Sequence, residues 1–325
     1  MQTRQLGRTD LHITPIGFGA WAIGGEWRFG WGPQDDSDSI AAIRQAVSRG
    51  MNWIDTAPAY GLGHSEEVVA RALADLPRPD RPYVFTKCSL VWGEDRVVRH
   101  DIASESIRRE VEDSLRRLQV DVIDLYQMHW PRWQGAAEAS SGNVADAWAT
   151  MADLKQQGKV RHIGVSNFTV DDLETAEAIA PVASLQPPYS MLRRGIEADL
   201  LPYCREHNIG VLGYSPMLSG LLTGAMTRER IEALAASDWR RNNKEFQEPQ
   251  LSANLALVEV LRAIGARHGR SAGEVAIAWT LRHPVMTAAI VGGRSASQVD
   301  GVIGAAGLTL SADELAEIEH ALPRV

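Results

Sequence analysis

The feature that most constrains this chain is a regular alternation of short apolar strands with amphipathic helices. Eight strands are predicted, beginning near residues 16, 53, 83, 122, 160, 184, 210 and 288, and helix follows each of them. Strands that alternate with helices form a parallel sheet. Eight such units within 325 residues predict an α/β fold, a (β/α)8 TIM barrel that occupies residues 1–325 as a single domain.

Two additions to the barrel are expected. Gln5-Leu6 and His12-Ile13 flank a turn and predict an N-terminal β-hairpin. Residues 216–249 predict a long loop after strand seven, and loops of this length are usually functional or mobile. No further strand-to-strand hairpin is expected after residue 20.

A dinucleotide-binding alternative is disfavoured. Gly17, Gly19 and Ala22 match the pattern G-x-G-x-x-A, which requires a helix directly after it. The glycine-rich stretch that follows, ending in Gly32-Pro33, does not predict a helix.

Composition excludes several classes of protein. The formal net charge is −8 with no basic cluster, which argues against nucleic acid as a partner. Cys88 and Cys204 fit neither a disulfide framework nor a zinc site, and no metal-ligand cluster is apparent. No apolar run is long enough for a membrane span, and the N-terminus lacks a signal-peptide core. We therefore expect a cytoplasmic protein that needs neither a membrane nor an oligomer.

Residues that transfer protons gather at predicted strand ends. Strands two, three and four end at Asp55, Lys87 and His129, and Tyr60 follows on the loop above Asp55. Active sites of this barrel lie at the C-terminal ends of the strands. An ammonium about 4 Å from a phenol supplies roughly the 4 kcal/mol needed to lower the phenol pKa by ~3 units. We therefore expect Lys87 to make Tyr60 a working acid, with Asp55 keeping Lys87 protonated and His129 orienting the substrate oxygen.

These same stretches resemble a known family. IDTAPAYGLGHSE, TKC and YQMHWP resemble the signatures of the aldo-keto reductases, and the match covers nearly the whole chain. IGVSNF, LQPPYS, GYSPMLSGLLTG and IVGGRSASQ resemble the family's cofactor-binding segments. The resemblance implies NADPH as the cofactor and reversible reduction of aldehydes or ketones, with Asp55, Tyr60, Lys87 and His129 as the catalytic residues.

The cofactor positions can be assigned along the later strands. Ser166, Asn167 and Gln186 are expected to hold the nicotinamide carboxamide, with Tyr214 stacked on the ring. The remaining candidates are Trp21; a pyrophosphate loop of Ser215, Pro216, Leu218 and Gly220; and Gly292, Arg294 and Gln298 after strand eight. Arg294 suits a 2′-phosphate because its planar guanidinium binds bidentately. Val291 and Gly301-Val302 depart from the residues that many relatives carry, Pro and Glu-Asn.

The substrate is expected to be a small-molecule carbonyl compound in an apolar cleft. Trp21, Trp92, Trp130 and Trp133 lie on loops at the catalytic end. Arg240, Arg241 and Lys244 could meet an anionic substrate, although such a run is more often a solvated surface.

Two other functions stay open at this point. Lys87 could be the nucleophile of a Schiff-base lyase. The chain could also be a non-catalytic NADPH-binding subunit similar to the potassium-channel β-subunits, in which the position of His129 is usually Asn.

Overall fold

A closed barrel of eight parallel strands forms the centre of the molecule. The computed structural model describes residues 1–27, 30–133, 141–235 and 238–323. The barrel closes in the order β10-β11-β12-β3-β4-β5-β8-β9. Its strands are β3 (Ile16–Gly19), β4 (Trp53–Asp55), β5 (Tyr83–Cys88), β8 (Ile123–Met128), β9 (Val160–Ser166), β10 (Ser184–Gln186), β11 (Gly210–Tyr214) and β12 (Met286–Gly292). The predicted (β/α)8 barrel is therefore confirmed.

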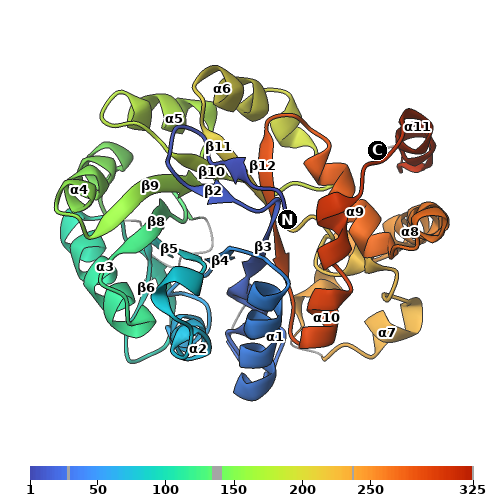
Figure 1. Cartoon of the computed structure of the whole chain (residues 1–325), viewed down its shortest axis with the longest axis horizontal. Helices are drawn as coiled ribbons and strands as arrows, with labels where there is room; N and C mark the ends of the chain where they lie inside the picture. The colour runs from blue at the N-terminus through green and yellow to red at the C-terminus, as the bar shows by residue number, and fades with distance from the viewer. Residues whose placement is uncertain (28–29, 134–140, 236–237, 324–325) are drawn as a thin grey trace.

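Helices surround the barrel (Figure 1). They are α1 (Asp36–Ser48), α2 (His64–Leu73), α3 (Ser104–Leu118), α4 (Val144–Gln156), α5 (Val170–Glu177), α6 (Leu200–Glu206), α7 (Arg228–Glu232), α8 (Gln250–His268), α9 (Ala272–Leu281), α10 (Ala296–Asp300) and α11 (Ala312–Ala321). Capping boxes at Thr169, Ser271 and Ser311 begin α5, α9 and α11. Within the described ranges, no helix has both the length and the apolar character to cross a membrane.

One predicted helix is shorter than expected. The sequence predicts a helix over residues 196–207, whereas the structure has a 3-10 turn at Gly195–Glu197 and then α6. Asp199 explains the late start, because its side chain accepts a hydrogen bond from the Leu200 backbone and caps the helix there. Pro202 then falls in the first turn, where a missing N–H costs nothing.

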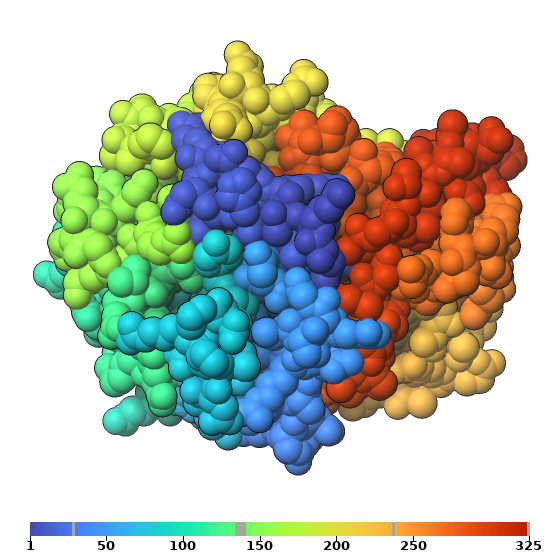
Figure 2. Space-filling view, in the orientation of Figure 1, coloured from blue at the N-terminus to red at the C-terminus, as the bar shows by residue number. Residues whose placement is uncertain are grey.

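The N-terminal hairpin covers one end of the barrel. It pairs β1 (Arg4–Gln5) with β2 (His12–Ile13), as predicted. In Figures 1 and 2 its dark blue residues lie across the barrel on the side facing the viewer. Its fully buried residues Leu6, Leu11 and Ile13 belong to one apolar cluster with the barrel-lining Trp53 and Phe85. This end is therefore filled by hydrocarbon and leaves polar chemistry to the opposite end.

A second hairpin corrects the expectation that none follows residue 20. β6 (Leu90–Trp92) and β7 (Val98–His100) pair antiparallel at the end of β5. The turn is closed by Asp95, whose carboxylate accepts from the Val97 backbone and forms an ion pair with Arg99. The expectation was wrong because the two runs that flank the polar turn, LVW and VRH, have only three residues each, which is too short to show the alternation typical of a strand.

The long segment after β11 lies over the barrel at the same end as β6 and β7. It contains 3-10 turns at Leu221–Thr223, Trp239–Asn242 and Lys244–Phe246 in addition to α7. Arg193, which follows β10, binds both carboxylate oxygens of Glu245 in this segment. Phe246 beside it is buried in the core that fills the space between barrel and helices. The segment therefore binds to the barrel through an ion pair and through an apolar contact.

Substitution of Gly17 should test the packing inside the barrel. A Cβ built at Gly17 would lie 2.1 Å from the Trp53 ring, which is fully buried. Overpacking of this kind costs about 1–3 kcal/mol. We expect Gly17→Ala to lower the urea midpoint of unfolding. Gly195→Ala, where no heavy atom lies within 4 Å, is the control and should leave the midpoint almost unchanged. Equal midpoints for the two variants would contradict this account of the core.

Candidate active site

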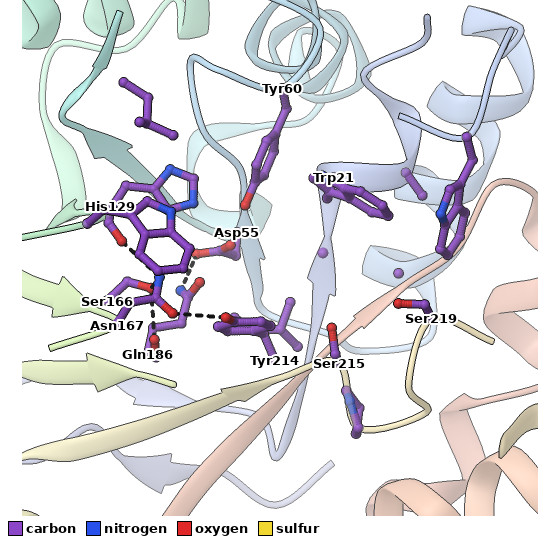
Figure 3. A pocket seen from close by; sticks show the side chains of 18 of the residues that line it. Trp21, Asp55, Tyr60, His129, Ser166, Asn167, Gln186, Tyr214, Ser215 and Ser219 are labelled. Atoms are coloured by element: carbon purple, nitrogen blue, oxygen red, sulfur yellow. Dashed lines mark hydrogen bonds between the residues drawn. The ribbon is translucent and has the colours of Figure 1, made fainter. Parts of the chain in front are cut away.

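The C-terminal ends of five neighbouring strands bring the predicted polar residues together. Lys87 on β5 lies directly opposite Gln127 on β8, and Ser166 on β9 lies opposite Gln186 on β10. Asp55 ends β4. The side chains of Asp55, Ser166 and Gln186 project into one pocket (Figure 3). This placement follows from parallel register, which aligns the carboxyl ends of all strands at one rim.

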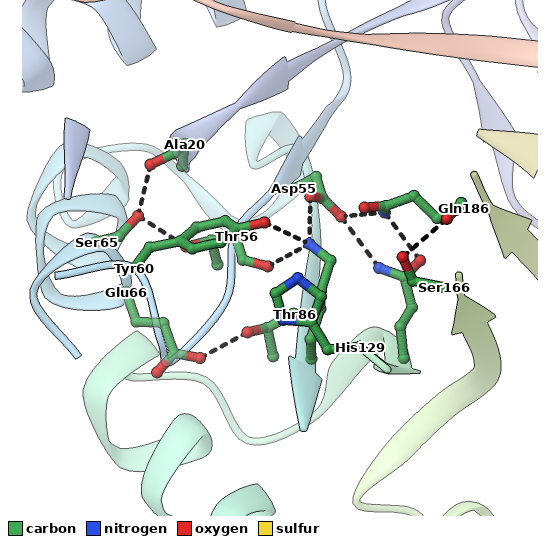
Figure 4. Close-up of polar contacts among 12 residues, drawn as sticks. Ala20, Asp55, Thr56, Tyr60, Ser65, Glu66, Thr86, His129, Ser166 and Gln186 are labelled. Carbon is green, nitrogen blue, oxygen red and sulfur yellow. Dashed lines mark hydrogen bonds and ion pairs between the residues drawn. The ribbon is translucent and has the colours of Figure 1, made fainter. Parts of the chain in front are cut away.

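A buried ion pair lies at the floor of this site. The Lys87 Nζ is 2.5 Å from Asp55 Oδ1, and the Lys87 side chain is entirely buried. The same ammonium donates to the Thr56 carbonyl at 3.0 Å and to the Tyr60 hydroxyl at 3.3 Å. Figure 4 shows these three contacts converging on one nitrogen. An ammonium has three protons, so the charge is fully hydrogen-bonded in spite of its burial.

The acidity of Tyr60 differs from the sequence-based expectation. The expectation was that Lys87 lowers the pKa of Tyr60. In the structure burial raises the pKa of Tyr60 well above its ordinary value, and the negative charge of Asp55 raises it further. Lys87 is held mainly by Asp55, so its field at the phenol is partly cancelled. Tyr60 is therefore protonated at neutral pH, which is the form that a proton donor requires.

His129 is a neutral imidazole beside the phenol. It follows the last residue of β8, and its ring meets the Tyr60 ring edge-on with centroids 5.8 Å apart. Burial lowers the pKa of His129 well below its ordinary value, and the charge of Lys87 lowers it further. A neutral ring has one N–H to donate to a substrate oxygen without competing with Tyr60 for the proton.

The second oxygen of Asp55 binds two amides, one of which the sequence analysis did not identify. Gln127 and Gln186 both donate to Asp55 Oδ2, at 3.0 and 2.8 Å. Gln186 was expected to help hold the nicotinamide. Gln127 could have been found from strand alternation, because it lies two residues before His129 and points to the same side of β8.

Hydrogen bonds between polar side chains connect the C-terminal ends of β9 and β11. Asn167 donates to the His129 carbonyl at 2.9 Å and accepts from the Tyr214 hydroxyl at 2.9 Å. Ser166 donates to the Gln186 carbonyl at 2.8 Å. Asn167 has a φ of 58°, in the left-handed region that Asn tolerates better than most residues. These contacts orient the ring of Tyr214, which lines the cavity.

The residues expected to bind the cofactor divide into two groups. One group lines the cavity and consists of Trp21, Ser166, Asn167, Gln186, Tyr214, Ser215, Pro216 and Gly292. The other does not line it and consists of Leu218, Gly220, Arg294 and Gln298. Leu218 is buried, and Gly220 with a φ of 93° starts the 3-10 turn at Leu221. Leu218 and Gly220 therefore support the conformation of the loop after β11 without lining the cavity.

Arg294 holds the loop between β3 and α1. Its guanidinium donates to Gln34 Oε1 at 2.5 Å, to the Trp31 carbonyl at 3.3 Å and to the Pro33 carbonyl. Gln298 accepts from the Arg294 backbone N–H at 2.8 Å. A cation whose hydrogen-bond partners are neutral can still attract a phosphate, because none of these partners cancels its charge.

The cavity in front of Tyr60 has a volume of about 450 Å³ and a largely aromatic wall. Trp21, Trp130 and Trp133 line it, as predicted, together with Trp27, Trp31 and Trp239, which the sequence analysis did not select. Trp92 does not line it and instead lies under the Arg117 guanidinium, 5.8 Å from the ring centroid. The hairpin that contains Trp92 contributes Leu90 and Val98 to the wall. Trp21 faces Tyr60 across the opening in Figure 3.

Two of the three basic residues considered for an anionic substrate, Arg240 and Arg241, have partners within the chain. Arg240 forms a partly buried ion pair with Asp238 and lies over the Trp31 ring at 4.6 Å from the centroid. Arg241 donates to the Leu234 carbonyl. Among the described residues, no group of His, Cys, Asp and Glu is arranged to hold a metal ion.

Comparison with known proteins places the chain in a family. Residues 15–323 match the model of the aldo/keto reductase family, and the chain belongs to this family. It is 34% identical to the NADH-specific methylglyoxal reductase of Escherichia coli strain K12, over all of both chains. It also resembles the solved glycerol dehydrogenase AKR11B4 of Gluconobacter oxydans, with a TM-score of 0.87 and 38% identity over 98% of this chain and 94% of that one.

A third relative was solved with a cofactor. The aldo/keto reductase of Klebsiella pneumoniae in complex with NADP and acetate matches with a TM-score of 0.73 and 25% identity, over 100% of this chain and 98% of that one. Neighbouring family members thus bind NADP, although the methylglyoxal reductase is named as specific for NADH.

A buried carboxyl supports the loop that follows Lys87. Glu110 on α3 accepts from the Ser89 backbone at 2.9 Å and from the Ser106 hydroxyl at 3.2 Å. Ser89 in turn accepts from the Trp130 backbone at 3.2 Å. Burial raises the pKa of Glu110 to about 8.

This carboxyl should make stability depend on pH. Between about pH 4.5 and 8 the folded chain holds a proton on Glu110 that the unfolded chain has lost. The stabilisation from this proton is therefore complete below pH 4.5, falls by about 1.4 kcal/mol per pH unit as pH rises, and is absent above pH 8. We expect Glu110→Gln to remove this slope, measured by urea unfolding from pH 5 to 9. The exposed Glu105→Gln on the same helix should keep the slope, and a slope unchanged in Glu110→Gln would contradict the assignment.

Proposed function

We propose that this protein transfers a hydride between NADPH and an aldehyde or ketone, with Tyr60 as the general acid and, in the reverse direction, the general base. The observation that supports this most directly is the position of the Tyr60 hydroxyl. It lies on the cavity wall, 3.3 Å from the buried Lys87 ammonium and beside the neutral His129. A proton donor, its charge partner and a substrate-orienting donor thus meet at one point of an apolar cavity.

The chain's own residues account for the proton transfer. The bound cofactor supplies or accepts the hydride. As the carbonyl oxygen gains negative charge it becomes a much stronger base than a phenolate, so Tyr60 gives up its proton despite its raised pKa. Lys87 then stabilises the phenolate, and His129 donates a hydrogen bond that positions the oxygen. Lys87 acts here as an ammonium, since its three protons are bound to Asp55, Thr56 and Tyr60, and this disfavours a Schiff-base function.

The cleft beside Tyr60 fits a nicotinamide cofactor. Gly292 brings no side chain to the cavity, and the Tyr214 ring is fixed there by its bond to Asn167. The Gln186 Oε1 has no hydrogen bond among the described residues, and it could accept from the carboxamide. Arg294 would hold the 2′-phosphate after leaving its contacts to the loop at Trp31–Gln34, and this supports NADPH over NADH.

Removal of the Tyr60 hydroxyl should abolish most turnover. We expect Tyr60→Phe to lower kcat by at least about 100-fold, the lower end for general acid catalysis. NADPH binding should change little, because the ring remains. Lys87→Met should behave similarly, since the phenolate would lose its charge partner. The measurement is oxidation of NADPH with a panel of carbonyl compounds, and Tyr83→Phe at the far end of β5 is the control. Normal turnover by Tyr60→Phe would refute the assignment.

Arg294 should determine the choice between the two cofactors. A hydrogen bond to a charged group contributes about 1.5–3 kcal/mol, which corresponds to roughly a 10- to 150-fold preference for NADPH. We expect Arg294→Ala to remove most of this preference by weakening NADPH alone, as measured by fluorescence titration of both cofactors.

Gln34→Ala provides the matched control for this test. It removes the side-chain acceptor of the Arg294 guanidinium, leaves the two backbone acceptors in place, and should leave NADPH binding unchanged or tighter. If Arg294→Ala weakens NADPH and NADH equally, the residue supports the loop and does not bind the phosphate.

A further inference from the structure

We propose that Gln127 is a positioning residue that holds the second oxygen of Asp55, so that the carboxylate binds Lys87 through one oxygen and leaves a Lys87 proton directed at Tyr60. The inference deepens the proposed function and rests on it, because the group being positioned is the charge partner of the proposed acid. Gln127 reaches Tyr60 only through Asp55 and Lys87.

The geometry around Asp55 carries this inference. Asp55 Oδ1 binds the Lys87 ammonium at 2.5 Å, whereas Oδ2 accepts from Gln127 Nε2 at 3.0 Å and from Gln186 Nε2 at 2.8 Å. The Gln127 Oε1 accepts from Gln186 Nε2 at 3.0 Å. The dashed lines in Figure 4 show this division, with Tyr60 and Thr56 on one side of Asp55 and Gln186 on the other. The two oxygens thus have different partners and cannot exchange without breaking three hydrogen bonds.

The burial of the Gln127 side chain makes its hydrogen bonds necessary. Gln127 is completely buried on the inner face of β8, one inward-facing position above Leu125 of the barrel's apolar cluster. An amide at such a depth is unfavourable unless it is hydrogen-bonded. Its position directly opposite Lys87 is set by the parallel register of β5 and β8. The amide therefore lies where it can reach Asp55 across the strand that contains Lys87.

Charge distribution explains what Gln127 contributes. A carboxylate with no donor on its second oxygen is free to turn so that both oxygens approach the ammonium, which places more negative charge close to the Lys87 Nζ. That rotation would draw the Lys87 Nζ from the Tyr60 hydroxyl, which lies 3.3 Å away. Two amide donors on Oδ2 oppose the rotation and withdraw negative charge from Asp55. Lys87 is then less neutralised, and more of its field acts on the phenol.

An NMR pH titration of the protein, with its lysines isotope-labelled at the ε-carbon, tests the inference without any substrate. The chain has four lysines, Lys87, Lys155, Lys159 and Lys244, so the NMR signals are few and Lys87→Arg assigns the buried one. Burial lowers the pKa of Lys87, while the charge of Asp55 opposes this shift. Loss of the Gln127 donor leaves more negative charge on the Asp55 carboxylate, and this charge favours the protonated form of Lys87. In Gln127→Met the titration of Lys87 should therefore move to higher pH. Gln127→Asn, too short to reach Asp55, should move it in the same direction.

A control variant separates this effect from disturbed packing. Leu125→Met changes an inward-facing residue of the same strand without removing a polar contact, and the Lys87 titration should stay where it is in the unaltered protein. A Lys87 titration that does not move in Gln127→Met, in a variant whose unfolding midpoint shows that it is folded, overturns the inference. A titration that moves equally in Leu125→Met also overturns it, because packing would then be the cause.

Kinetics gives the second measurement. We expect Gln127→Met to lower kcat about 10-fold, with KM and the Kd of NADPH changed less than 2-fold, because the residue acts on the charge partner of the acid and not on the ligands. If the unaltered protein reduces no carbonyl compound, the proposed function fails, whereas the Lys87 titration still decides the role of Gln127. An unchanged kcat together with an unmoved titration would show that Gln127 only fills the barrel.

Discussion

The structure depends on one buried ion pair, Lys87 with Asp55. An ammonium inside a protein is costly unless every proton is bound and an opposite charge lies close by. Here Asp55, the Thr56 carbonyl and the Tyr60 hydroxyl take the three protons. This requirement fixes where β4, β5 and the loop after β4 must lie relative to one another. The phenol is one of the groups that satisfy the ammonium, so the same contacts that make the pair tolerable also position Tyr60 at the cavity.

The two ends of the barrel differ in polarity and in packing. At one end the N-terminal hairpin and the Trp53 layer exclude water with hydrocarbon alone. At the other end the loops form an aromatic cavity over a polar floor. Arg294 and Arg240 both contact the loop at Trp31, one through its carbonyl and one over its ring. The aromatic wall of the cavity and the proposed phosphate site therefore share the loop that contains Trp31.

Prediction from the sequence was correct for features that depend on short stretches of the chain. The eight strands were predicted from short apolar runs, and the strand-end rule then selected Asp55, Lys87 and His129, which the structure brings together. It failed at β6 and β7, whose alternation was too short to distinguish from loop. It also failed at Gln127, since an amide in an apolar strand identifies no partner until the register places it opposite Lys87. Trp92 and Trp27 show the same limit, because a loop aromatic can point to either side.

The sequence by itself determined the eightfold alternation of strand and helix, the family, and the residues at the strand ends, because each of these depends on spacing within a few residues. Only the tertiary structure decided how those residues share charge. The pKa of Tyr60 rises where proximity to Lys87 alone predicts a fall, because burial and Asp55 together outweigh the ammonium. Desolvation and the division of hydrogen bonds around Asp55 are sums over groups far apart in the chain, and no local pattern contains them.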